Sequence, residues 1–382
     1  MSISAFKIAH KLITGSGAIE QLADELTRLD VDNPLIVTDA ALVTSGTVEL
    51  ALAHLGGRSY EIYDRVMPDP EIAIVEDCMQ VYREGGHDGL IGLGGGSAID
   101  IAKSVAAYAG YHGALEDLFG IDQVPRKGPP LIAIPTTAGT GSEVTNVAIL
   151  SDKQAQLKKG IVSDYLLPDV ALVSPQMTLT CPRGVTAASG VDALVHAVEA
   201  YLSLNASPIT DALAIGAVKL IARALPKAYA NPANLPARED MATASLMAGM
   251  AFGNAGVGAV HALAYPLGGR FNIAHGVSNA LLLPYVMQWN KLACVERMQD
   301  IAIAMGVNVS GLSTIESADK AVAAMSELCR AVEIPVGLNS FGVPLDAIPA
   351  MAVEAAGIER LMRNNPRRLS AMDIEKIYRA AY

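Results

Sequence analysis

The chain has 382 residues, of which 51% are hydrophobic and 18% charged, and its formal net charge is −11. This composition excludes an intrinsically disordered chain, and the length predicts two domains with a cleft between them as the expected place for chemistry. The negative charge and the lack of a basic run argue against nucleic acid and anionic membrane surfaces as partners.

The four cysteines are widely spaced and form no C-x-x-C pair. We therefore expect no disulfide framework and a reducing, cytoplasmic location. The first 25 residues lack a continuous apolar run, so no secretory signal is expected. The apolar composition also leads us to expect a homodimer or a higher homo-oligomer.

The first half of the chain alternates short β-like runs with helical runs, which is typical of a parallel sheet flanked by helices. Apolar strands are predicted at residues 35–39, 90–93 and 131–134. Residues 69–71 predict a helix start, with Asp69 as N-cap and a proline at the first helical position. We therefore expect an α/β domain over residues 1–180.

The second half, over residues 181–382, is predicted to be all helical. From Thr186 onward, Ala, Leu, Met and Glu recur at helical spacing with almost no β-like alternation. Within it, residues 241–269 carry no Asp, Glu, Lys or Arg, and a segment of that length would span a bilayer. Glycines, an asparagine and a histidine interrupt the segment, so we interpret it as a buried helix pair rather than a membrane span.

A glycine-rich turn follows the predicted strand at 90–93. It consists of Gly94, Gly95, Gly96 and Ser97. At such a turn, backbone N–H groups and the positive end of a helix dipole converge on a phosphate, which a side chain would hold away. Ser97 and Asp100 also resemble a capping box for a helix that ends near Ala109. Alone, the motif fits a dinucleotide pyrophosphate and a ligand-free turn equally well.

The acid expected at a strand end about 20 residues after such a loop is missing. Asp39, at the end of the predicted strand 35–39, is the alternative partner for the ribose hydroxyls. A carboxylate there would repel a 2′-phosphate, which favours NAD over NADP. The alternative role of Asp39 is a helix N-cap.

A second polar loop follows the predicted strand at 131–134. Its hydroxyl-bearing residues are Thr136, Thr137, Thr140 and Ser142. They offer hydroxyl and N–H groups to the same ligand, or else they form a hydrogen-bonded surface turn. Two such loops, each at a strand end, favour a nucleotide site more than either loop alone.

Four residues of the helical half form a candidate metal site. Asp192 and His196 are four residues apart and share a helix face, and His261 and His275 follow in apolar surroundings. A histidine in an apolar helix is commonly a core residue, but a buried aspartate is costly unless it is paired or binds metal. One oxygen and three nitrogens suit Fe(II), Zn(II) or another borderline divalent ion.

Together these motifs resemble the iron-dependent (group III) alcohol dehydrogenases, the group that includes lactaldehyde reductase and 1,3-propanediol dehydrogenase. The matching segments are Gly94–Ser97 with Asp100 and Lys103, residues 135–145, Asp192 with His196, and His261 with His275. The likeness extends from about residue 5 to about residue 380.

The resemblance implies a Rossmann-like N-terminal domain, a helical C-terminal domain, and an iron or zinc ion between them on the aspartate and three histidines. It implies that the two loops hold the pyrophosphate and nicotinamide of NAD, and that Lys158 lies near the nicotinamide ribose. The alternative for Lys158 is one member of a solvated pair with Lys159. The implied reaction is hydride transfer between NAD and a small primary alcohol, diol or aldehyde.

Two positions depart from the family pattern. Many members carry a histidine, a proton carrier, four residues after the third ligand, where this chain has Tyr265. Either the phenol or a water chain relays the proton, or the relay lies elsewhere; we expect Tyr265 and His275 to be the catalytic residues. Many members also have an asparagine before the second helix, where Asp69 strengthens NAD preference or only caps the helix. Phe252 is expected in the core, with the wall of a substrate pocket as the alternative.

Three rival functions use parts of the same pattern. A dehydroquinate synthase-like enzyme would need clustered Arg and Lys near the metal, and the segments around the histidines offer only Arg270. A metal hydrolase leaves both nucleotide-type loops without a purpose. A non-catalytic binding protein would not change NADH absorbance with alcohols and aldehydes.

Overall fold

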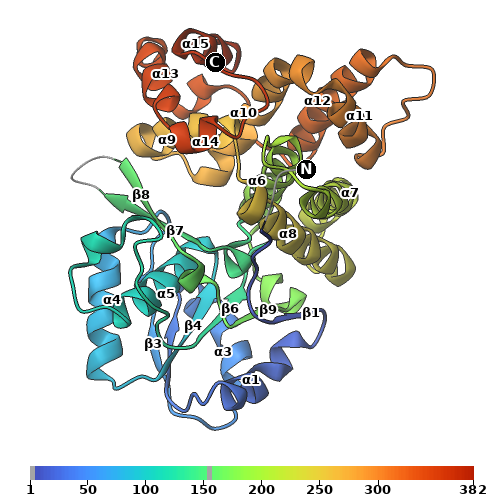
Figure 1. Cartoon of the computed structure of the whole chain (residues 1–382). Helices are drawn as coiled ribbons and strands as arrows, with labels where there is room; N and C mark the ends of the chain where they lie inside the picture. The colour runs from blue at the N-terminus through green and yellow to red at the C-terminus, as the bar shows by residue number, and fades with distance from the viewer. Residues whose placement is uncertain (1–4, 153–156) are drawn as a thin grey trace. The chain divides into compact units, whose positions relative to one another are not determined.

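The computed structural model describes residues 5–152 and 157–382. The described residues form two compact units. One is Lys7–Cys181, and the other is Pro182–Tyr382 together with residues 5 and 6. In Figure 1 the first unit is coloured from blue to green and the second from green to red.

The first unit is built on a parallel sheet of six strands. In spatial order these are β1 (Leu12–Thr14), β9 (Val170–Val173), β6 (Leu131–Pro135), β4 (Gly89–Gly94), β2 (Pro34–Val37) and β3 (Glu61–Tyr63). A smaller sheet pairs β8 (Leu157–Val162) parallel with β5 (Gly120–Ile121) and antiparallel with β7 (Val147–Asp152). The predicted Rossmann-like α/β fold is confirmed.

Helices cover both faces of the six-stranded sheet. They are α1 (Leu22–Arg28), α2 (Ala40–Thr44), α3 (Thr47–Leu52), α4 (Ile72–Glu84) and α5 (Gly96–Ala109). Successive residues of β2 point to opposite faces: Leu35 packs with the residues of α4 and α5, and Ile36 with those of α1 and α3. Burial on both faces explains why these strands are continuous apolar runs in the sequence.

The strand order reverses between β2 and β4. The chain runs from β2 to its neighbour β3 and then crosses back through α4 to β4, on the other side of β2. In open α/β sheets, ligands bind outside the carboxyl ends of the strands at such a switch point. Asp39 follows β2 and the glycine turn follows β4, so the topology brings both to this edge.

Two local predictions about helix starts in this unit are wrong. Helix α4 begins at Ile72 with Glu71 as N-cap, whereas Asp69 lies outside it with a φ of 53° and pairs with Lys158. Helix α5 ends at Ala109 as predicted, but its N-cap is Gly95, so no capping box forms there. A glycine N-cap has no side chain that could accept a hydrogen bond, and the Asp100 carboxylate instead accepts from Ser142 and Ile149.

The second unit is helical throughout its described residues. Its helices are α6 (Arg183–Leu202), α7 (Pro208–Ala230), α8 (Leu235–Ala255), α9 (Ala259–Phe271), α10 (His275–Asn290), α11 (Val295–Ala304), α12 (Thr314–Ala331), α13 (Ile348–Ala356), α14 (Glu359–Met362) and α15 (Ala371–Ala380). Ser207, Ser313 and Ser370 cap α7, α12 and α15 through their hydroxyls.

The uncharged segment 241–269 forms parts of α8 and α9, as the helix-pair interpretation predicts. The two helices meet at 101° across a short break, where Gly256 has a φ of 79° that favours glycine. By length and composition, none of the described helices could cross a membrane alone, and α8 with α9 could only as a bent pair.

Candidate active site

Helix α6 contributes two of the predicted metal ligands. Asp192 and His196 are one helical turn apart and are 2% and 5% exposed. The helix is apolar over most of its length, so these side chains stand in a buried layer rather than on a solvated face. A carboxylate kept in such a layer needs nearby partners.

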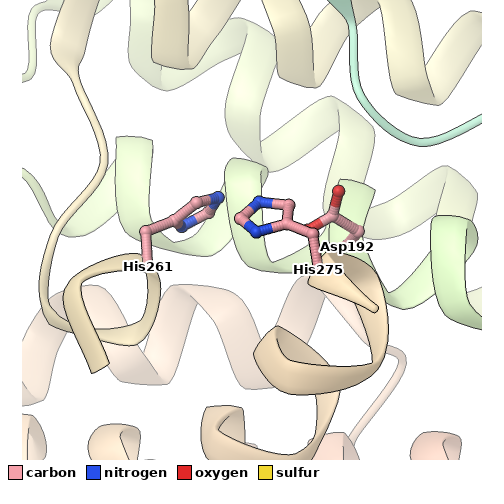
Figure 2. A group of neighbouring side chains, drawn as sticks. All are labelled: Asp192, His261 and His275. Atoms are coloured by element: carbon pink, nitrogen blue, oxygen red, sulfur yellow. The ribbon is translucent and has the colours of Figure 1, made fainter. Parts of the chain in front are cut away.

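Helices α9 and α10 contribute the other two, His261 and His275. His275 is the first residue of α10, and Asn272, with a φ of 53°, turns the chain between the helices. One ligand atom from each of Asp192, His261 and His275 lies within 4.8 Å of the other two. Figure 2 shows the two imidazole rings directed toward each other, with Asp192 beside His275.

The fourth predicted ligand, His196, lies beside this group. Its ring stacks on that of His261, with centroids 4.7 Å apart, and on that of Phe252, with centroids 4.2 Å apart. Among the described residues, the 4.8 Å limit includes the other three ligands but not His196. Its direct coordination therefore stays a prediction.

The electrostatics of Asp192 suit a cation. Burial favours the protonated form, but His196, His275 and His261 and a hydrogen bond from Asn279 outweigh it and hold the pKa of Asp192 below its ordinary value. The carboxylate is therefore ionised at neutral pH and ready to bind a positive charge.

Two supporting residues were missed by reasoning from the sequence. Glu199 accepts hydrogen bonds from His261 Nδ1 at 2.6 Å and from the Val260 N–H at 2.7 Å. Asn279 donates through Nδ2 to Asp192 Oδ1 at 2.7 Å and lies 3.2 Å from His275 Nε2. The spacing of Glu199, seven residues after Asp192, places it on the same helix face and was the available signal.

The donor set fits a divalent metal. His261 Nε2 is buried and has no hydrogen-bond partner among the described residues. A buried polar atom without a partner costs roughly 1–3 kcal/mol, so such atoms commonly mark the place of a ligand. With a carboxylate oxygen and imidazole nitrogens around it, that ligand is best matched by Fe(II) or Zn(II).

Tyr265 lies one turn after His261 on α9, close to this group. The centroids of the Tyr265 and His275 rings are 6.5 Å apart, and Arg360 Nη2 donates to the Tyr265 hydroxyl at 3.4 Å. Sequence reasoning did not single out Arg360. Arg270, the basic residue that the dehydroquinate synthase-like alternative would use, pairs with Glu354 at 2.8 Å.

The two predicted nucleotide loops lie against each other in the first unit. A Cβ atom at Gly96 would lie 2.8 Å from Thr140 Cγ2, and one at Gly95 would lie 3.6 Å from Thr137. The Thr136 N–H donates to the Gly94 carbonyl at 2.9 Å. Gly94 itself has a φ of 159°, and a Cβ there would lie 2.7 Å from the Ala98 Cβ. A side chain at Gly96 would therefore clash where the two loops meet, whereas a Cβ at Gly95 would make only an ordinary van der Waals contact.

The two carboxylate oxygens of Asp39 lie in different surroundings, which bears on its two predicted roles as helix N-cap and ribose partner. Oδ1 accepts from the N–H groups of Ala41 and Leu42, both at 3.0 Å, and so caps α2. Oδ2 lies 4.0 Å from the position of a Cβ on Gly94, beside the glycine turn. The helix-cap role is present, and it leaves the second oxygen next to the turn.

Asp100 and Ser142 use their polar atoms inside the unit. Asp100 accepts from the Ser142 hydroxyl and, at 3.0 Å, from the Ile149 N–H. The fully buried Lys103 donates to Ser142 and Thr145 hydroxyls, both at 3.1 Å. Helix α5 is thus tied to the polar loop that follows β6.

Burial shifts the titration of this network. Desolvation lowers the pKa of Lys103 to about 8, against the pull of Asp100 and Glu143. Desolvation also raises the pKa of Glu143 to about 7.

Lys158 on β8 forms an ion pair with Asp69, so two predicted cofactor residues from different segments meet. The Lys158 side chain is 13% exposed, and Lys159 pairs with Asp152 at 2.8 Å. Lys158 is therefore a largely buried, paired lysine, whereas the Lys159 side chain is 37% exposed.

Known proteins resemble this chain along nearly its whole length. Residues 9–175 match the family described as iron-containing alcohol dehydrogenase, and residues 186–382 match the C-terminal part of the Fe-containing alcohol dehydrogenase family. Long-chain-alcohol dehydrogenase 1 of Geobacillus thermodenitrificans is 47% identical, over 96% of this chain and 94% of that protein. The NAD-dependent methanol dehydrogenase of Bacillus methanolicus is 37% identical, over 98% and 99% of the two chains.

Among solved structures, that of a 1,3-propanediol oxidoreductase superposes with a TM-score of 0.97 at 40% identity and covers 100% of both chains. The sequence matches span both units described above, and they include the glycine turn, the polar loop and the buried carboxylate with its histidines. This chain therefore belongs to the iron-containing alcohol dehydrogenase family.

Proposed function

We propose that the protein is an NAD-dependent alcohol dehydrogenase and aldehyde reductase that acts on a small primary alcohol or diol. The observation that carries the proposal is the convergence of ligand atoms of Asp192, His261 and His275 within 4.8 Å, together with the buried His261 Nε2, which has no hydrogen-bond partner among the described residues. The NAD-dependent methanol dehydrogenase and the 1,3-propanediol oxidoreductase among its relatives support the substrate class and the cofactor.

The metal we propose is Fe(II), with Zn(II) as the alternative. Asp192, His261 and His275 would hold it, and His196, one turn from Asp192, would complete the set by reorienting its ring. A divalent ion there supplies Lewis acidity, which lowers the pKa of an alcohol oxygen. Tyr265 would exchange the proton with solvent, while Arg360 orients its hydroxyl.

The cofactor we propose is NAD, which accepts or supplies the hydride. N–H groups of Gly95, Gly96 and Ser97, at the start of α5, would hold its pyrophosphate. Asp39 Oδ2 would accept from the ribose hydroxyls and disfavour a 2′-phosphate.

The remaining predicted cofactor residues would act around the same turn. Thr136, Thr137 and Thr140 would line the polar side of the turn, and Lys158, oriented by Asp69, would contact the nicotinamide ribose. Asp100 and Ser142 would keep the loop in shape, since their polar atoms are engaged within the unit.

We further propose a cytoplasmic homo-oligomer, a dimer at least. The four cysteines, all within the described part of the chain, are buried and form no disulfide, which suits a reducing compartment.

The proposal is tested with protein purified without oxygen. Metal content is measured by mass spectrometry, and turnover is followed by NADH absorbance with short alcohols, diols and the corresponding aldehydes. We expect about one Fe(II) or Zn(II) per chain, reversible loss of turnover with a chelator, and a strong preference for NAD over NADP.

His261→Ala separates the metal site from the cofactor site. It should abolish bound metal and turnover while NADH binding, followed by fluorescence, stays unchanged. Retention of both metal and turnover would contradict the ligand assignment, and full turnover by metal-free wild-type protein would overturn the proposed mechanism.

A further inference from the structure

Glu199 is a buried carboxylate with two defined partners. Its side chain is 2% exposed, and no lysine or arginine forms an ion pair with it in the part of the chain that the structure describes. Oε2 accepts from His261 Nδ1 at 2.6 Å and Oε1 from the Val260 N–H at 2.7 Å. A carboxyl group buried in this way is costly unless hydrogen bonds satisfy its oxygens, and these two bonds do so.

The bond to Nδ1 defines the state of the His261 ring. A carboxylate only accepts hydrogen bonds, so this contact requires a ring hydrogen on Nδ1, and in the neutral ring that can bind a metal the lone pair then lies on Nε2. Nε2 is buried and has no hydrogen-bond partner in the part of the chain that the structure describes. The Glu199 contact therefore turns the nitrogen that can bind a cation away from the carboxylate and leaves it free.

The hydrogen bond from the Val260 N–H holds the Glu199 carboxylate at the start of α9, the helix that carries His261. Val260 is the second residue of α9, and its N–H is one of those that the first helical turn leaves unpaired. A negative charge at a helix N-terminus is also favoured by the helix dipole. A Cβ at Gly258 would lie 3.3 Å from Glu199 Oε1, so the chain enters α9 close to the carboxylate.

Helix α6 thereby supports the metal site in two ways. Asp192 supplies a ligand atom, and Glu199, two turns later on the same face, orients a ligand that belongs to α9. The two residues are fixed relative to each other by one helix, so the positions of Asp192 and His261 are coupled.

We propose that Glu199 is a positioning residue that fixes the tautomer and orientation of His261 as a metal ligand. This inference rests on the proposed metal site. Partners of this kind raise the basicity of a ligating imidazole, and their loss typically weakens metal binding about 10- to 100-fold. If Glu199 only held α9 in place, its loss would instead affect folding without affecting metal affinity.

The test compares Glu199→Gln with wild-type holoenzyme. Zn(II) affinity is measured by competition with a chromophoric chelator, and the Co(II)-substituted forms are compared by their visible spectra. We expect the zinc dissociation constant to rise about 10- to 100-fold with a shifted cobalt spectrum, and NADH binding to stay unchanged. Equal zinc affinity and an unchanged spectrum would overturn the inference.

Asp300→Asn is the matched control. Asp300 accepts a 2.6 Å hydrogen bond from the Tyr201 hydroxyl, and Tyr201 lies on α6 two residues after Glu199, so the variant also removes a carboxylate acceptor next to this helix. Its zinc affinity should equal that of wild type. If it weakens zinc as much as Glu199→Gln does, the effect is general destabilisation and the inference is wrong.

A measurement on the zinc-loaded wild type keeps the inference testable if Glu199→Gln does not fold. Nitrogen NMR of the histidine rings, assigned with His261→Ala, reports which ring nitrogen carries hydrogen. We expect hydrogen on His261 Nδ1; hydrogen on Nε2 would overturn the inference. Wild-type protein that binds no zinc would instead refute the proposed function.

Discussion

A Cβ atom on Gly276 would lie 2.8 Å from the carbonyl oxygen of Ala188, so the first turn of α10 lies against α6 at a distance that glycine allows. The same Cβ would be 3.5 Å from that of Asp192. His275 is the neighbouring residue, so this close approach brings the His275 and Asp192 side chains together.

Gly276→Ala should therefore disrupt the metal site. The clash is with backbone, which cannot move aside cheaply, and overpacking of this kind costs about 1–3 kcal/mol. We expect a loss of thermal stability and at least a tenfold weaker zinc affinity, measured by unfolding and chelator competition. Gly184→Ala, where nothing lies within 4 Å of the added Cβ, is the control and should lower neither.

Gly96→Ala should affect the cofactor and spare the metal. The added Cβ would lie 2.8 Å from Thr140 Cγ2, at the contact between the two loops. Separating the loops should raise the NADH dissociation constant about tenfold or more, since even 1.4 kcal/mol is a factor of ten. NADH fluorescence titration checks this, with metal content measured in parallel. Unchanged NADH affinity would show that the turn does not hold the pyrophosphate.

Asp39→Ser should relax the preference for NAD. Serine keeps the helix-capping oxygen but removes the charge that would face a 2′-phosphate. The NADPH-to-NADH ratio of kcat/KM should rise roughly tenfold or more, because like charges placed together cost several kcal/mol. Asp39→Ala should shift the ratio similarly but also lose about 1 kcal/mol of stability with the cap. A constant ratio in both variants would exclude this residue as the selector.

Glu143 should make stability depend on pH. Burial raises its pKa from an ordinary value of 4.5 to about 7, so the folded state binds the proton more tightly than the unfolded chain. Its contribution to the free energy of unfolding is fully present below pH 4.5 and is lost as the pH rises through about 7. Lys103, with a pKa of about 8, stays charged across this range.

Glu143→Gln cannot titrate, so its stability relative to wild type should increase from pH 4.5 to pH 7. The difference in unfolding free energy between the variant and wild type should change by ~3 kcal/mol. It is measured by urea unfolding at several pH values. Glu316→Gln should behave oppositely, because hydrogen bonds from Ser313 lower the pKa of the exposed Glu316. A pH-independent difference for Glu143→Gln would disprove the assignment.

Tyr265→Phe tests the proton relay. If the phenol exchanges the proton, removing its hydroxyl should lower kcat by roughly 100-fold and change the pH profile, because general acid–base groups contribute 10² or more. Metal content and NADH affinity should stay at wild-type values. Tyr285→Phe on α10 is the control. Full kcat in Tyr265→Phe would place the relay in water or in another group.

The sequence by itself determined the α/β and helical character of the two units, the strands at β2, β4 and β6, and the glycine turn. These follow from local periodicity and from backbone conformations that few residues adopt. The spacing of Asp192 and His196 likewise follows from one helix. The two predicted helix starts are wrong because of contacts that are not local. The Asp69 and Asp100 carboxylates bind partners on other elements, Lys158 and Ser142.

Only the tertiary structure decided which residues support the site. Glu199 and His261 are 62 residues apart, and Tyr265 and Arg360 are 95 apart. Local patterns specify which face of a helix is apolar, but the packing of that face against a distant helix selects its partners. The close approach at Gly276 and the pairing at Glu199 follow from how α6, α9 and α10 pack, and no local signal specifies that packing.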